Sequence, residues 1–187
     1  MSIFSELRNE CLIKELQREL NTDVLLFGFD NLTYFGNLQQ VEDCRVATLT
    51  PAIESETNYV QIFTPGGEIE EVEFARVDLW QVVAKGTSIA NDPFENVAGV
   101  SAKEEERSES CDLIWFLKRM VGEDVAIGTL GGYLFVGVLS DVRDDLALLR
   151  VDEIFIQGTS TPISSDDVRS VVINLEAITS VSSAQSC

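Results

Sequence analysis

The segment VAIGTLGGYLFVGVLSDVRDDLALLRVDEIFI, residues 125–156, decides the fold class of this chain. It is rich in β-branched, aromatic and leucine residues, and the first two types favour strands. The strand-like runs are residues 125–129, 133–141 and 146–156. Glycines separate the first run from the second, and an Asp-rich segment separates the second run from the third. Both residue types favour tight turns, so we expect a turn at each of these places. The segment contains neither histidine nor cysteine, so we interpret it as structural scaffold.

The residues around this segment predict a small, mainly β unit. Two further apolar runs follow it, at 169–174 and 177–182, which gives five predicted strands. A helix is predicted in front of the strands, because apolar residues recur there with helical spacing: Leu113, Ile114, Leu117 and Val121. Five short strands do not suffice for a sandwich of two full sheets, and they suit a strongly bent sheet closed into a small barrel.

The chain also repeats itself. At an offset of 101 positions, ten residues are identical to their counterparts. These residues are Leu12, Ile13, Leu16, Arg18, Asp23, Val24, Gly36, Leu38, Val41 and Asp43. Further along we align the halves at an offset of 99, which pairs Phe74 with Ile173, Leu79 with Ile178 and Val82 with Val181. The repeat predicts two tandem five-stranded barrels, each preceded by an α-helix, at residues 1–85 and 110–187, joined by a polar linker at 86–109.

The charge of the chain disfavours polyanionic partners. With 32 acidic and 13 basic side chains among 187 residues, the formal net charge is −19. Such a charge repels nucleic-acid phosphates and anionic membranes. Arg143 and Arg150 are the candidate nucleic-acid contacts, because they come nearest to a local basic patch. No apolar run approaches the roughly 20 residues of a membrane span, so we expect a cytoplasmic protein without a membrane partner.

The residue types argue against an enzyme. Histidine is absent, which removes the commonest general base at neutral pH and most catalytic metal sites. The four cysteines, at positions 11, 44, 111 and 187, are scattered singly and lack the ligand spacing of a zinc site. Phosphate-binding glycine motifs are also absent. We therefore expect free thiols, no catalytic residues, no metal and no cofactor.

The pattern of residues 125–149 resembles the first motif of Sm-like (LSm) domains. That motif has a strand, a glycine turn, a strand ending in aromatic-x-Gly-x-Leu, an acidic turn and an apolar third strand. Gly137 and Leu139 occupy the Gly-x-Leu positions, and Gly36 and Leu38 are their counterparts in the first half. The ending VVINLEAITSVSS, residues 171–183, resembles the closing strands of the second motif. Other small barrels, including the PRC-barrel family, have a similar sequence pattern of short strands and glycine turns.

The resemblance also implies an RNA site whose residues are missing here. RNA-binding Sm-like proteins place an Asp and an Asn around the turn after the second strand. The Asp position holds Glu42 and Arg143 in the two halves, and the Asn position holds Val46 and Ala147. The corner before the last strand, ARVD at 75–78 and NLEA at 174–177, lacks the Arg-Gly pair of the family. We therefore expect no RNA binding of the usual kind.

Three functions remain, and assembly is favoured. Sm-like domains commonly assemble by pairing edge strands, and an open edge is satisfied when another strand joins it. We predict a non-enzymatic assembly or adaptor module that binds itself or another protein through barrel edges, as a homo-oligomer or an intramolecular pseudo-dimer. The alternatives are an Sm-like RNA-binding regulator and a small-ligand-binding protein with a pocket between the barrels. Aromatic candidates for that pocket are Trp80, Trp115, Phe116 and Tyr133.

Overall fold

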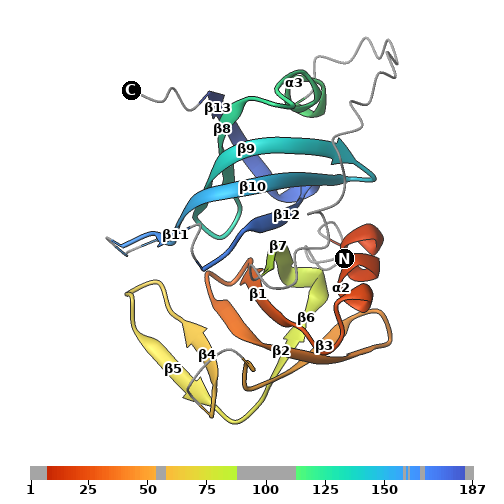
Figure 1. Ribbon diagram of the computed structural model, residues 1–187. Helices are drawn as coiled ribbons and strands as arrows, with labels where there is room; N and C mark the ends of the chain where they lie inside the picture. The colour runs from red at the N-terminus through yellow and green to blue at the C-terminus, as the bar shows by residue number, and fades with distance from the viewer. Residues whose placement is uncertain are drawn as a thin grey trace.

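The computed structural model describes residues 8–53, 58–87, 113–157, 159, 161–164 and 167–183. Within these residues the protein is mainly β, with two α-helices and thirteen strands that join in one antiparallel sheet. Figure 1 shows the two halves of the chain stacked on each other, with the first half below and the second above. The mainly β fold class predicted from the sequence is therefore confirmed.

Within the described residues, each half has one α-helix before its strands. The first half contains α2 (Glu10–Arg18), β1 (Asp23–Gly28), β2 (Thr33–Glu42), β3 (Val46–Thr50), β4 (Val60–Phe63), β5 (Ile69–Val72), β6 (Ala75–Asp78), a 3-10 helix (Leu79–Gln81) and β7 (Val82–Thr87). The second half contains α3 (Leu113–Arg119), β8 (Asp124–Thr129), β9 (Tyr133–Arg143), β10 (Leu146–Phe155), β11 (Ile163–Ser164), β12 (Ser170–Asn174), a 3-10 helix (Leu175–Ala177) and β13 (Ile178–Ser183). The five strands predicted from residues 125–182 correspond to β8, β9, β10, β12 and β13.

Helix α2 begins at a capped end. The side chain of Asn9 accepts hydrogen bonds from the backbone N–H groups of Cys11 and Leu12, which otherwise lack partners in the first turn. Its apolar stripe is buried, as Leu12 and Leu16 show. The helix ends at Arg18, and Leu20, which follows it, is 40% exposed.

The sheet has the same strand order twice but does not close. The order is β13-β8-β9-β10-β12-β7-β1-β2-β3-β6, so each half contributes five strands in equivalent positions. The ladder ends at β6 and β13, and the closed barrels predicted from the sequence are not formed by hydrogen bonds between the described strands. In each half a 3-10 helix, rather than a hairpin turn, connects the last two strands, and these strands do not pair with each other.

The strand registers test the repeat. The offset of 101 is confirmed in the first hairpin of each half, where Val24 lies opposite Gly36 and Val125 opposite Gly137. The aspartate turns also match, since Asp43 and Asp144 both have positive φ, at 50° and 51°. Positive φ at consecutive residues is typical of the tight turns that match the twist of a hairpin.

The offset of 99 predicted further along is wrong. Asp78 and Asn174 each begin a 3-10 helix by accepting a backbone hydrogen bond, and they are 96 positions apart. Leu79 therefore corresponds to Leu175 and not to Ile178. Residues 75–78 correspond to 171–174, so the two corners compared in the sequence, 75–78 and 174–177, are not equivalent. The cause is a longer connection in the first half, where β3 and β4 are separate strands although both match the single strand β10.

The predicted boundary of the first half falls inside a strand. Strand β7 runs to Thr87, two residues into the linker predicted at 86–109. The remainder of that linker lies outside the described residues.

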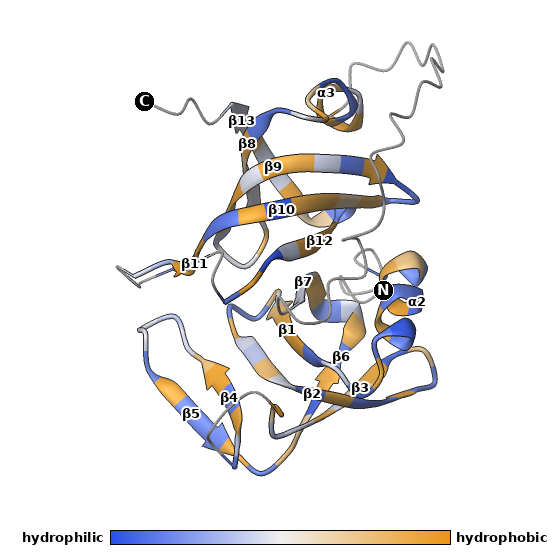
Figure 2. Cartoon of the chain, in the orientation of Figure 1, coloured by the Kyte–Doolittle hydropathy of each residue, from blue (hydrophilic) through white to orange (hydrophobic). Residues whose placement is uncertain are grey.

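Two groups of buried apolar side chains form the core, and each draws on both halves. One joins Phe27 and Val83 of the first half to Phe135 and Ile173 of the second. The other joins residues of α2 and β1 to Leu148 and Val172 of the second half. Figure 2 shows apolar residues on the strands that face each other between the halves. The core is therefore continuous across the boundary.

Candidate functional site

The two halves are joined by a pair of strands. Strand β7 of the first half pairs antiparallel with β12 of the second, with Ala84 opposite Ile173 and Gly86 opposite Val171. Strand β7, at the edge of the first five-stranded set, thus pairs with β12, at the edge of the second set. We call this β7–β12 contact, with the side chains that cover it, the joint.

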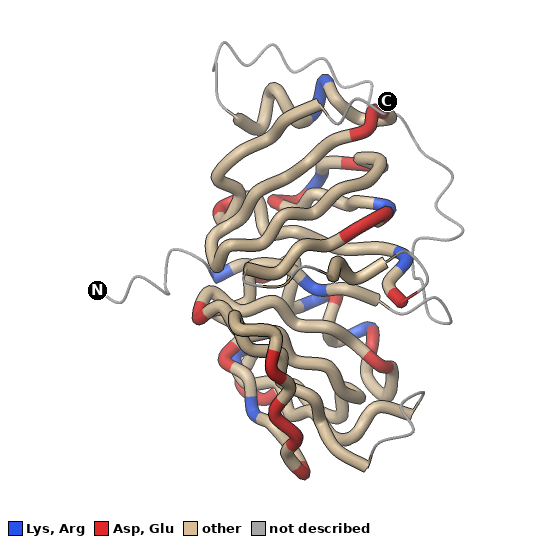
Figure 3. The backbone as a smooth tube through the Cα atoms, turned by 90° about the vertical axis from the view of Figure 1, so that its left-hand side faces the viewer, with Lys and Arg blue, Asp and Glu red and all other residues tan. Residues whose placement is uncertain are grey.

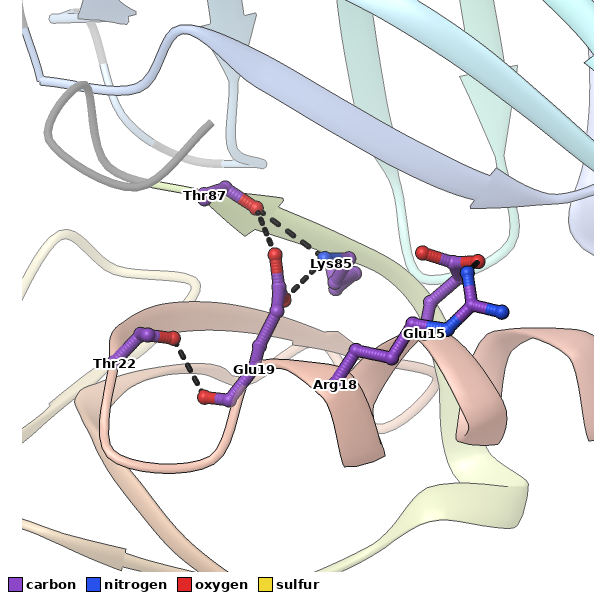
Figure 4. Close-up of polar contacts among 6 residues, drawn as sticks. All are labelled: Glu15, Arg18, Glu19, Thr22, Lys85 and Thr87. Carbon is purple, nitrogen blue, oxygen red and sulfur yellow. Dashed lines mark hydrogen bonds and ion pairs between the residues drawn. The ribbon is translucent and has the colours of Figure 1, made fainter. Parts of the chain in front are cut away.

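A buried ion pair lies beside the joint. Lys85, opposite Val172, is fully buried, and its Nζ is ion-paired with Oε2 of Glu19, which is 4% exposed. Thr87 connects them, because its hydroxyl donates to Glu19 Oε1 at 3.0 Å and accepts from Lys85 Nζ at 3.3 Å. Figure 4 shows the three side chains converging between the end of α2 and β7. A charge this deep is tolerated because it is paired and hydrogen-bonded.

Helix α2 also contacts the second half through its cap. The Asn9 amide donates to the backbone oxygen of Asp145 at 2.9 Å and to Oδ1 of Asn174 at 3.0 Å. The same side chain that caps α2 therefore ties the helix to the turn before β10 and to the end of β12.

An aromatic group covers the other side of the joint. The rings of Phe27 and Tyr133 meet edge to face with centroids 5.2 Å apart, and Phe27 and Phe135 do the same at 5.1 Å. The Tyr133 hydroxyl lies 3.0 Å from the backbone oxygens of both Gly28 and Leu32 and can donate to either. Burial raises the pKa of Tyr133 to about 12.

Tyr133→Phe is expected to lower the free energy of unfolding by about 1 kcal/mol near pH 7, because a hydrogen bond between the halves is lost while both carbonyls keep a backbone donor. The raised pKa also predicts a pH effect. Folded Tyr133 keeps its proton between pH 10 and about 12, where the unfolded chain loses it, so stability falls as pH rises through this window. Urea unfolding at pH 7 to 12 checks both effects, and a Phe variant with an unchanged pH slope would contradict the second.

The two ends of the sheet are open edges. Among the described strands, β6 pairs only with β3 and β13 only with β8. On β6, Arg76 is exposed between the buried Ala75 and Val77, while β13 beyond Ile178 is largely exposed and rich in serine. These edges occupy the positions that β12 and β7 occupy at the joint.

The four Gly-x-Leu residues singled out in the sequence are buried in the second strand of each half. Leu38 and Leu139 are fully buried. A Cβ on Gly36 would lie 2.7 Å from the backbone oxygen of Thr50, and one on Gly137 would lie 2.0 Å from that of Arg150. Glycine is required at both positions because the neighbouring strand approaches too closely for any side chain.

The two arginines considered for nucleic acid are exposed but lie apart. Arg143 ends β9 opposite Leu146, and its Nε is 3.5 Å from a carboxylate oxygen of Asp141. Arg150 is four residues further along β10, a separation of about 13 Å along an extended strand. The structure therefore does not bring them into one contact, and the turn beside Arg143 is acidic.

The aromatic residues considered for a ligand pocket lie in three different places. Trp80 follows β6. The guanidinium groups of Arg45 and Arg8 lie over its ring, 4.3 and 5.3 Å from the ring centre. Trp115 and Phe116 lie on α3, whereas Tyr133 is buried at the joint.

The chain was compared with protein-family models and with curated proteins. It matches none of them. The strand pairing at the joint therefore carries the functional argument.

Membrane spans, metal ligands and thiols were the remaining features to locate in the part of the chain described. No helix there is long and apolar enough to cross a membrane. No cluster of three or more potential metal-ligating side chains occurs among the same residues. Cys11 and Cys44 are free thiols, while Cys111 and Cys187 lie outside the described residues. Figure 3 shows that positions occupied by acidic residues are spread over the backbone of both halves.

Sequence reasoning missed the buried Lys85–Glu19 pair. Lys85 was placed at the boundary of the first half, and the polar residues after it indicated a linker. A weak signal was present, since Lys85 directly follows the apolar residues Val82, Val83 and Ala84 of a strand-like run.

Proposed function

We propose that this protein is a non-enzymatic assembly module, in which two Sm-like bent-sheet units act as a tandem pair and the open strand edges bind other protein strands. The observation that carries the proposal is the joint, because one chain already uses an edge-to-edge strand pair to connect two sets of five strands. The same two kinds of edge recur at β6 and β13, where the described residues leave them open. An open edge binds an added strand through its backbone groups.

The charges favour this function over RNA binding. The chain carries a net charge of −19, which opposes contact with phosphates. Arg143 lies beside Asp141 and does not meet Arg150, so no paired basic contact forms. Backbone strand pairing needs no positive patch.

Sedimentation velocity over a range of concentrations tests the proposal. We expect species heavier than the 20.7 kDa chain, and we expect Ser180→Lys with Ser182→Lys on β13 to weaken them, because lysines on an open edge oppose pairing. Gln40→Lys is the matched control, since Gln40 is exposed on β2, a strand paired on both sides.

Two results would contradict the proposal. One is an equal loss of association in the β13 variant and the Gln40 control. The other is salt-sensitive binding to a U-rich or A-rich oligoribonucleotide that Arg143→Ala abolishes, which would favour the RNA-binding alternative.

A further inference from the structure

Exposed apolar side chains gather around the β4–β5 hairpin. Eight large apolar side chains are exposed among the described residues, and four of them lie between β3 and β6. These four are Ile53, Tyr59, Ile69 and Phe74, with exposed fractions of 75%, 43%, 50% and 59%. Figure 1 shows β4 and β5, in yellow, at the lower left of the molecule. Exposed apolar side chains that gather in one region, rather than occur singly, are typical of an interaction surface.

The register of the hairpin separates its two faces. Val60 lies opposite Val72, and both pack in the core group that includes α2, so this face is covered. Phe63 and Ile69 form a pair on the other face, and Glu71 lies on that face two residues further along β5. Phe63 packs against the core, whereas Ile69 is 50% exposed. The second face therefore continues from the core to an exposed isoleucine.

The same region is strongly acidic. Residues 46–75 contain six glutamates and no lysine or arginine. Four of these glutamates are exposed and have no ion-pair partner among the described residues: Glu68, Glu70, Glu71 and Glu73. The repeat does not require these charges, because the registers place Ile163 and Ser164 of the second half at the positions of Glu70 and Glu71.

The position of Glu71 decides the chemistry of the partner. Glu71 and Ile69 share a face and are about 7 Å apart along the strand, so a partner that covers Ile69 also removes water from the Glu71 carboxylate. An uncharged or acidic partner would leave that carboxylate without a counter-charge, which is costly, whereas a lysine or arginine would pair with it. Acidic residues also oppose strand pairing at an edge, but that role does not require an exposed isoleucine among them.

We propose that the face of the hairpin formed by Phe63, Ile69 and Glu71 binds a cationic, amphipathic segment of a partner protein, in which lysine or arginine alternates with apolar residues. The apolar side chains of the partner cover Ile69, and its cations pair with Glu71 and the glutamates beside it. The contact uses side chains on a face of the sheet and not backbone groups on the open edges β6 and β13, so it goes beyond the proposed function.

Three synthetic peptides test the charge and the apolar contact separately. In these fluorescein-labelled, twelve-residue peptides, lysine alternates with leucine, lysine with glycine, or glutamate with leucine. Fluorescence anisotropy with the full-length protein should show the lysine-leucine peptide binding about tenfold tighter than either of the others, and less tightly as salt is added. Equal binding of the lysine-glycine peptide would show that net charge alone attracts the peptides and would overturn the proposal.

Variants of the hairpin locate the contact. Glu71→Lys with Glu73→Lys should weaken binding of the lysine-leucine peptide about tenfold, and Ile69→Gln should weaken it about fivefold. Glu123→Lys with Asp124→Lys is the matched control, because it changes the net charge equally at exposed residues between α3 and β8. Figure 1 shows these elements at the opposite end of the molecule from the hairpin. The control should weaken binding about twofold or less.

The variants also decide between this contact and a general effect of charge. Equal losses in the two double variants would overturn the proposal, as would unchanged binding by the Ile69→Gln protein. Every altered side chain is exposed, so urea unfolding should give each variant the stability of the parent protein, which separates loss of binding from loss of fold. Peptide binding does not depend on self-association, so a failure here leaves the sedimentation test of the proposed function unaffected.

Discussion

Lys85→Met is expected to lower the free energy of unfolding by about 3 to 5 kcal/mol. Methionine fills much of the same space but removes the ammonium group that pairs with Glu19. The carboxylate, which is 4% exposed, then keeps only the hydroxyl of Thr87 as a described side-chain donor. Removing one partner of a buried pair costs more than the pair contributes, because the remaining charge stays out of water.

Two further variants make this result specific. Glu19→Met combined with Lys85→Met should recover most of the loss, because an apolar pair of similar volume often replaces a buried ion pair at little cost. Lys14→Met, on the exposed side of α2, should change stability by about 0.5 kcal/mol or less. Urea unfolding measures all three. A Lys85→Met variant within about 1 kcal/mol of the parent protein would show that the pair is not a determinant of stability.

The position of this pair gives it a role in the joint. Glu19 is the C-cap residue of α2 and Lys85 lies on β7, so the pair fixes the end of the helix to the strand that pairs with β12. The corresponding positions in the second half hold Met120 and Val181, so the open edge β13 carries no such pair. The internal joint is thereby distinguished from the open edge at β13.

Much of the local structure could be predicted from the sequence because it depends on neighbouring residues. Strand runs, the aspartate turns and the helix before each set of strands all follow from short patterns, and the registers confirm the repeat at an offset of 101. The offset of 99 predicted for the later strands was wrong because apolar residues such as Leu, Ile and Val replace one another freely, so a sequence comparison can align them in more than one way. The caps of the two 3-10 helices and the strand registers show that Asp78 corresponds to Asn174.

Features that depend on distant residues could not be predicted. Lys85 and Glu19 are far apart in the sequence, and nothing near either residue indicates that the other will be buried beside it. The open ends of the sheet were also not predictable, because closure depends on the direction that the chain takes after each 3-10 helix. The candidate edges are thus a product of topology, whereas Gly36 and Gly137 were found from a local motif.

Gly137→Ala is expected to destabilise the protein by about 3 kcal/mol. The new Cβ would lie 2.0 Å from the backbone oxygen of Arg150, so a strand must move. Arg150 has little freedom to move, because β10 holds it between Val138 on one side and Ser170 on the other. Relief of the clash therefore disturbs the ladder that leads to the joint, and we expect the loss in urea unfolding at neutral pH.

Alanine substitutions at two other glycines should destabilise the protein less than Gly137→Ala does. Gly36→Ala should destabilise less, since its Cβ would approach the oxygen of Thr50 to 2.7 Å rather than 2.0 Å. Gly66→Ala is the matched control, because its Cβ would meet no atom within 4 Å and the residue lies in an exposed turn. It should be neutral or slightly stabilising, as a loss of freedom in the unfolded chain predicts. A Gly137→Ala protein as stable as the Gly66→Ala protein would mean that β9 and β10 adjust without strain and that the close approach does not fix the bend.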